Sequence, residues 1–177
     1  TFFAHVHPTL AKDGTLRYET AFPKPGMYRL LGDFYPTGGV PQLIAETVFV
    51  PGSAEDIPSF DPIVLKPDVE AQKGENTTME LELSPVQPIV GEKTLLEFKL
   101  KPADGMEKYL GAWAHMMAAS DDLVDTLHEH PFSADGGDTM YFNVIFPRAR
   151  TYRVWVQFQR KGVLNTVAFN IPVTELK

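Results

Sequence analysis

The stretch Thr126-Leu-His-Glu-His-Pro131 repeats an earlier stretch, Phe3-Ala-His-Val-His-Pro8, and the residues that follow each copy repeat with it. His128 lies 123 positions after His5, and the later matches lie 124 positions apart, so one inserted residue near Gly136 explains the change. Those later matches are Phe22-Pro23 with Phe146-Pro147, Tyr28-Arg29 with Tyr152-Arg153, and Phe34 with Phe158. Chance does not keep such a register, so the sequence predicts two copies of one module.

The two copies are unequal in length. A long strand-like stretch beginning at Thr78 precedes His128, whereas only Thr1 to Ala4 precede His5. We therefore expect residues 1–52 to be the carboxy-terminal half of a first β-sandwich module, 53–77 a linker, and 78–177 a complete second module. An uncovered half-module would expose its core strands, so another segment, or strand exchange within a homodimer, is expected to complete it.

Composition excludes several classes of function. A formal net charge of -7 without a cluster of Lys and Arg argues against nucleic acid and against an anionic membrane surface as partners. The absence of cysteine excludes disulfides, thiolate catalysis and cysteine-based zinc or iron-sulfur sites. No run of apolar residues approaches the ~18 that a membrane span needs, and no signal peptide begins the chain. His, Met, Asp and Glu remain as candidate metal ligands.

The pattern is that of β-strands almost throughout. The first module has three segments rich in branched and aromatic residues, separated by turn signals: Leu16–Phe22, Met27–Leu31 and Leu43–Val50. This pattern predicts three strands in a meander. The stretch Pro51–Asp68 has little periodicity and is typical of a connector.

The second module contains seven short strand-like segments, which predicts an all-β fold, an antiparallel sandwich of immunoglobulin or cupredoxin type. These segments are Met79–Leu83, Thr94–Leu100, Ala112–Ala119, Asp125–Glu129, Thr139–Phe146, Thr151–Gln159 and Thr166–Pro172. Ser120–Leu127 has a helix-like pattern with Ser120 as a candidate cap, but its eight residues fit a loop equally well.

Three histidines of the second module form a candidate metal site. Because side chains alternate along a strand, His128 and His130 point to the same face. His115 lies thirteen residues before His128, in the segment expected to be its hairpin partner. Three imidazoles that converge from two neighbouring strands would form a copper or zinc site with open coordination positions.

Other residues are candidates for auxiliary roles. One of Met116 and Met117 must face away from His115 into the core, while the other could lend a thioether to copper. His5 and His7 repeat the later pair and form a second candidate metal site, with Asp33 as an auxiliary ligand, although Gln157 occupies the equivalent position in module two. The alternative role for both His-x-His-Pro segments is structural: the imidazoles hydrogen-bond neighbouring groups and brace the loops, and proline ends the strand.

The motif Tyr109-Leu-Gly-Ala-Trp-Ala-His115 followed by Leu127-His-Glu-His-Pro131 resembles a signature of bacterial secreted or membrane-anchored proteins of poorly defined function. In that family an upstream, half-related module carries Phe-x-His-x-His-Pro, as at Phe3–Pro8 here. The resemblance implies a periplasmic or secreted location and a β-sandwich related to copper-resistance and YtkA-like modules. It implies no particular activity.

These observations lead to two functional hypotheses. The first is a non-catalytic, extracytoplasmic protein that captures or delivers a metal ion through His115, His128 and His130, with copper favoured over zinc. The second is a structural or interaction module in which the histidines only brace loops. An oxidase or hydrolase that uses an open metal position ranks last, because the sequence places no general base beside the histidines.

Overall fold

The computed structural model describes residues 2–34, 36–40, 42–52 and 64–176. The chain divides into two compact units, Thr1–Phe60 and Asp61–Lys177, and each is described here by itself. No helix among the described residues is long and apolar enough to cross a membrane. Residues 53–63 of the connector expected at 53–77 lie outside the described residues, which resume at Val64.

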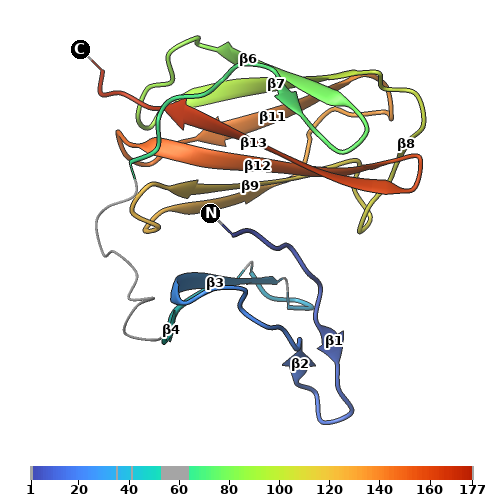
Figure 1. The fold of residues 1–177 in the computed structure, drawn as a ribbon, viewed down its shortest axis with the longest axis vertical. Coiled ribbons are helices and arrows are strands. Elements are labelled where there is room, and N and C mark those ends of the chain that lie inside the picture. Colours follow the sequence, from blue (N-terminus) through green and yellow to red (C-terminus); the bar gives the residue numbers. More distant parts are fainter. Residues whose placement is uncertain (1, 35, 41, 53–63, 177) are drawn as a thin grey trace. The chain divides into compact units, whose positions relative to one another are not determined.

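The carboxy-terminal unit consists of two antiparallel sheets (Figure 1). One has the strand order β10-β9-β12-β13, with β8 paired to β12, and the other has the order β11-β7-β6-β5. The strands are β5 Gln72–Lys73, β6 Thr78–Ser84, β7 Lys93–Lys101, β8 Met106–Glu107, β9 His115–Ser120, β10 Thr126–Glu129, β11 Thr139–Ile145, β12 Thr151–Arg160 and β13 Val163–Pro172. The all-β prediction is confirmed, and the two sheets are consistent with a β-sandwich module.

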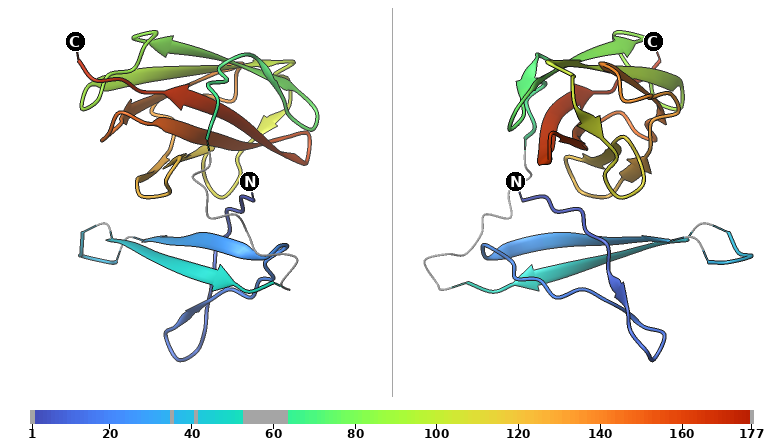
Figure 2. Two further views of the ribbon diagram at one scale, coloured as in Figure 1. Left: turned by 60° about the vertical axis from the view of Figure 1, so that its left-hand side comes forward. Right: turned by 90° about the vertical axis from the view of Figure 1, so that its right-hand side faces the viewer.

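Alternating side chains of both sheets build one core. In β7, Thr94, Leu96, Phe98 and Leu100 are buried, and the residues between them are more accessible. Buried residues of β9, β12 and β13 join the same cluster from the other sheet, which forms the second layer in the views of Figure 2. This period of two is what a sandwich requires, because each strand buries one face and exposes the other.

All seven strands predicted for the second module are present, with ends shifted by a few residues. The helix-like segment is a loop: Ser120 ends β9, and Thr126 begins β10. Leu123 adopts a positive φ of 58°, which a right-handed helix does not allow. The loop was the other of the two expected conformations.

The described residues of the amino-terminal unit form two separate strand pairs. β1, Thr9–Leu10, pairs with β2, Leu16–Arg17, and β3, Gly26–Phe34, pairs with β4, Gln42–Val50. The predicted meander is therefore wrong in its first strand, because Leu16–Phe22 forms only the short β2, which pairs with β1. Its alternating residues Leu16 and Tyr18 remain exposed, so no buried face fixes a longer strand there.

The internal repeat is visible in the hydrogen bonds of two tyrosines. The Tyr28 hydroxyl donates to the Lys24 carbonyl at 2.8 Å. The Tyr152 hydroxyl lies 3.3 Å from the Arg148 carbonyl and donates to the Asp125 carboxylate at 2.8 Å. Each hydroxyl also accepts the backbone N–H of the residue four positions earlier. The repeated phenylalanine packs on each tyrosine, with ring centroids 4.5 Å apart for Phe22–Tyr28 and 4.8 Å for Phe146–Tyr152. Both units thus contain the tyrosine corner that is typical of immunoglobulin-like sandwiches.

The repeated positions differ in burial. Val154 and Phe158 of β12 are fully buried, whereas Leu30 and Phe34, their equivalents 124 positions earlier in β3, are exposed. β3 and β4 carry a large share of the exposed apolar side chains of the amino-terminal unit: Met27, Leu30, Leu31, Phe34, Leu43, Ile44 and Phe49. The β3–β4 hairpin therefore has the apolar pattern of one layer of a sandwich. Among the described residues of this unit, no second layer covers it.

Candidate metal centre

The β9–β10 hairpin positions the three histidines of the carboxy-terminal unit. The ladder sets His128 opposite Met117 and Glu129 opposite Met116. Extended by one residue, the same register sets His130 opposite His115. Met116 is fully buried in the core, so His115, one position before it, points to the opposite, outer face of the sheet.

A charged network fixes the loop that joins these strands. Both nitrogens of the Arg148 fork donate to the Asp122 carboxylate at 2.9 Å, and the Arg148 Nε donates to Asp125 at 2.7 Å. The Ser120 hydroxyl also donates to Asp122, at 2.6 Å. The hydrogen bonds from Arg148 hold the pKa of the Asp122 carboxyl well below its usual range. The acidic loop is thus neutralised by arginine rather than open to a cation.

Asp122→Asn is expected to destabilise the carboxy-terminal unit by about 1–2 kcal/mol at neutral pH. A carboxyl whose folded pKa is lowered stabilises the fold above its unfolded pKa of about 4 and loses this contribution as the pH falls towards the folded value. The difference between the two proteins should therefore be constant near neutrality and shrink below about pH 4. Urea unfolding at a series of pH values measures it. A gap that does not change down to pH 2 would contradict the role given to Arg148.

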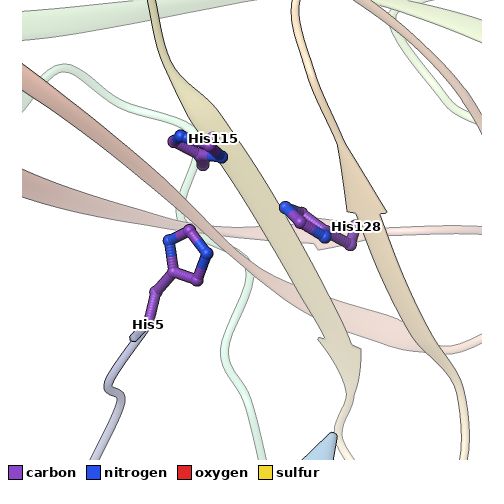
Figure 3. A group of neighbouring side chains, drawn as sticks. All are labelled: His5, His115 and His128. Carbon is purple, nitrogen blue, oxygen red and sulfur yellow. The ribbon is translucent and has the colours of Figure 1, made fainter. Parts of the chain in front are cut away.

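The three imidazole rings lie close together. Ring centroids are 4.7 Å apart for His115 and His130, 5.1 Å for His128 and His130, and 6.0 Å for His115 and His128. The Nε2 of His130 lies 2.9 Å from the Nδ1 of His115. Ring nitrogens of His115 and His128 lie within 4.8 Å of each other, and Figure 3 shows these two rings beside the neighbouring strands β9 and β10. The convergence expected from the hairpin is thus what the structure shows.

A backbone carbonyl determines which ring nitrogen of the buried His115 carries the proton. The Nε2 of His115 lies 2.9 Å from the carbonyl oxygen of Tyr109, and His115 is only 2% exposed. A carbonyl oxygen can only accept a hydrogen bond, so Nε2 of His115 carries the proton. In the neutral ring, Nδ1 then holds the lone pair, and it faces His130. A histidine that binds a metal through one ring nitrogen usually donates the N–H of its other nitrogen to a carbonyl or carboxylate. The contact of His115 with the Tyr109 carbonyl has this form.

The turn from Tyr109 to Ala112 presents that carbonyl. Its two ends exchange backbone hydrogen bonds of 2.8 and 3.1 Å. The central residues Leu110 and Gly111 both have positive φ, 49° and 89°, which is the pattern of a type I′ turn. Leucine is disfavoured in this conformation, and such strain tends to be kept where a site requires a fixed backbone. Tyr109 belongs to the motif of the sequence, but a role for its carbonyl oxygen was not predicted.

Residues of β9 and β12 line the same face as His115. Met117 lies between His128 and Trp155 in the ladder, so it is placed to contact the site. Gln157 lies opposite His115, is buried, and donates from Nε2 to the Thr166 hydroxyl at 3.1 Å. Met116 does not fit the predicted role of auxiliary ligand, because its side chain is buried in the core.

The second candidate site lies in the amino-terminal unit. The rings of His5 and His7 are 5.5 Å apart in a segment before β1 that is not a strand. Asp33 is an exposed residue of β3. The binding of a metal by this pair stays a prediction.

The spacing of the three carboxy-terminal rings is compatible with a shared ion. Imidazole nitrogen bonds copper or zinc at about 2.0–2.1 Å, which places the ring centroid about 3.2 Å from the ion. Two rings on one ion are then about 4.5 Å apart at a right angle and about 6.4 Å apart when they lie in line. The three centroid distances, 4.7, 5.1 and 6.0 Å, fall within that interval. The cluster could therefore hold a metal ion.

Comparison with known proteins identifies the family. Residues 71–175 match the family described as Domain of unknown function (DUF8832). The chain belongs to this family. The DUF8832 region contains every strand from β5 to β13, and with them His115, His128 and His130. No curated protein and no solved structure matches the chain.

Proposed function

We propose that the DUF8832 unit binds a metal ion through His115, His128 and His130, and that the protein captures or delivers this ion without catalysing a reaction. The observation that carries the proposal is the approach of three imidazole rings to one another, with centroids 4.7, 5.1 and 6.0 Å apart. The periplasmic or secreted location is proposed with it, on the resemblance of the His-x-His-Pro motif to bacterial envelope proteins.

Copper is favoured over zinc by the chemistry of the ligands, because a site with given nitrogen ligands generally binds cupric ion more tightly than zinc. Met117 on the same face adds a soft sulfur that suits the cuprous state.

Ion binding requires the hydrogen bond between His130 and His115 to change. In the absence of an ion, His130 Nε2 carries a proton and donates it to His115 Nδ1. A shift of that proton to Nδ1 of His130 exposes the Nε2 lone pair, while His115 keeps its bond to Tyr109. Both nitrogens could then act as ligands once the rings turn their lone pairs towards one ion. Metal affinity should accordingly depend on the tautomers that these contacts set.

The second candidate function is structural bracing, and two contacts favour it. The chain of hydrogen bonds from His130 to His115 to the Tyr109 carbonyl would by itself tie the end of β10 to the Tyr109–Ala112 turn. This function requires no ion, so metal titration separates it from the first.

The test uses a chain with His5→Ala and His7→Ala, in which only three of the five histidines remain. Metal-free protein is titrated with copper and with zinc by calorimetry, and the copper form is analysed by electron paramagnetic resonance. We expect saturation at one ion per chain, coordination by imidazole nitrogen, and loss of both when His128→Ala is added. The absence of saturable binding would exclude metal handling and leave the bracing function.

A further inference from the structure

Four side chains lie at the corners of one rectangle on the outer face of the sheet that contains β9 and β10. His115 and Met117 lie two residues apart on β9, and the register sets His128 opposite Met117. Extended by one residue, it sets His130 opposite His115. Neighbouring corners are then about 5–7 Å apart, both across the strands and along them. Three corners carry imidazoles, and the fourth carries the thioether of Met117.

The three imidazoles lean towards the middle of this rectangle. Diagonal neighbours on an antiparallel strand pair are about 7–8 Å apart. The rings of the diagonal pair His115 and His128 have their centroids only 6.0 Å apart. The rings of His128 and His130, which lie along one strand, have centroids 5.1 Å apart. An ion held by these three rings would therefore lie over the rectangle, beside the fourth corner.

Met117 and its neighbour Met116 face opposite sides of the sheet. Met116 is fully buried in the core, whereas Met117 is half-buried on the face that carries the histidines. On this face Met117 has His128 opposite it on one side and Trp155 opposite it on the other. A methionine side chain has three rotatable bonds, so its sulfur can turn towards an ion on the histidine side.

We propose that Met117 is the fourth ligand of this site and that the site uses it to hold cuprous copper. The inference rests on the proposed function, since it requires the three histidines to be ligands. A thioether is a soft donor that suits the cuprous ion. All four donors are neutral, so the bound ion keeps its full charge, and a partly buried site penalises a divalent charge more than a monovalent one. Three imidazoles and one thioether thus favour the lower oxidation state.

The two adjacent methionines provide a matched pair of variants. In the chain with His5→Ala and His7→Ala, Met117→Leu and Met116→Leu make the same change on opposite faces of β9. Cuprous affinity is measured without oxygen by competition with a colorimetric chelator, and cupric affinity by calorimetry. Met117→Leu should weaken cuprous binding about tenfold or more, because losing a ligand costs at least as much as losing a residue that orients one. Since the change conserves volume, cupric affinity should stay within about threefold. Met116→Leu should change neither affinity.

Methyl resonances of methionine give a readout that does not depend on affinity. The chain has six methionines, and isotope labelling of their methyl groups gives a signal from each. Cuprous ion is diamagnetic, so it shifts a signal without broadening it. The Met117 signal, identified by its loss in Met117→Leu, should move when one equivalent of cuprous ion is added, and the Met116 signal should stay in place.

The outcomes distinguish this inference from the function on which it rests. If both oxidation states bind through His128, but Met117→Leu and Met116→Leu bind cuprous ion equally well, Met117 is not a ligand and the site of three histidines stands. If neither oxidation state binds saturably, the site and its fourth ligand are both overturned.

Discussion

Replacing His130 with alanine is expected to weaken copper binding by about 100-fold or more. Loss of an outer residue that merely orients a ligand costs about 10- to 100-fold in metal affinity, and loss of a ligand itself should cost at least as much. His130 lies beyond the end of β10 and is exposed, so its removal should leave the fold intact. Competition with a chelator of known affinity, in the chain without His5 and His7, gives the constant.

Glu129→Ala is the matched control for this measurement. Glu129 lies next to His130 in sequence, but the ladder sets it opposite Met116, on the face away from the histidines. Its removal changes the net charge without changing a proposed ligand, so copper affinity should stay within about twofold. If His130→Ala binds copper as tightly as Glu129→Ala does, His130 is not a ligand.

Phe158→Ala is expected to lower the free energy of unfolding of the carboxy-terminal unit by about 3–5 kcal/mol. Phe158 is fully buried in the core cluster, and a cavity of this size in a closely packed sandwich is only partly refilled. Both tryptophans of the chain, Trp113 and Trp155, belong to this unit. Tryptophan fluorescence during urea unfolding therefore reports on the affected unit.

Phe34→Ala removes the same side chain at the equivalent position of the repeat. Phe34 is 37% exposed, so the change should cost less than about 1 kcal/mol in its own unit and leave the tryptophan transition in place. Equal destabilisation by the two variants would show that the burial of these repeated positions does not differ as described.

The features predicted well from the sequence are those that depend on the alternation of side chains along a strand. Alternation along β9 and β10, with a hairpin between them, was enough to bring His115, His128 and His130 to one face. The seven strands of the carboxy-terminal unit followed from the same alternation, because two sheets bury one side of each strand. The repeat also predicted that Tyr28 and Tyr152 occupy equivalent positions, and each hydroxyl lies within hydrogen-bond distance of the carbonyl four residues earlier.

Features that depend on the backbone or on missing neighbours were not predictable in this way. The Tyr109 carbonyl supports His115, but a carbonyl belongs to every residue and leaves no mark in the sequence. Only the neighbouring Leu110-Gly111 pair indicates a turn there. The pattern of Leu16–Phe22 indicates a strand, yet strand length is decided by the surface that a strand can cover, and Leu16 and Tyr18 remain exposed.

The unequal burial of the histidines bears on how an ion would leave. His115 is enclosed and held by Tyr109, whereas His130 is accessible beyond the last residue of its strand. An incoming donor from another molecule would reach the coordination sphere on the His130 side and replace that imidazole first. Transfer could then proceed by stepwise ligand substitution, in which the ion is never fully solvated. A carrier with one anchored and one replaceable ligand combines retention with release.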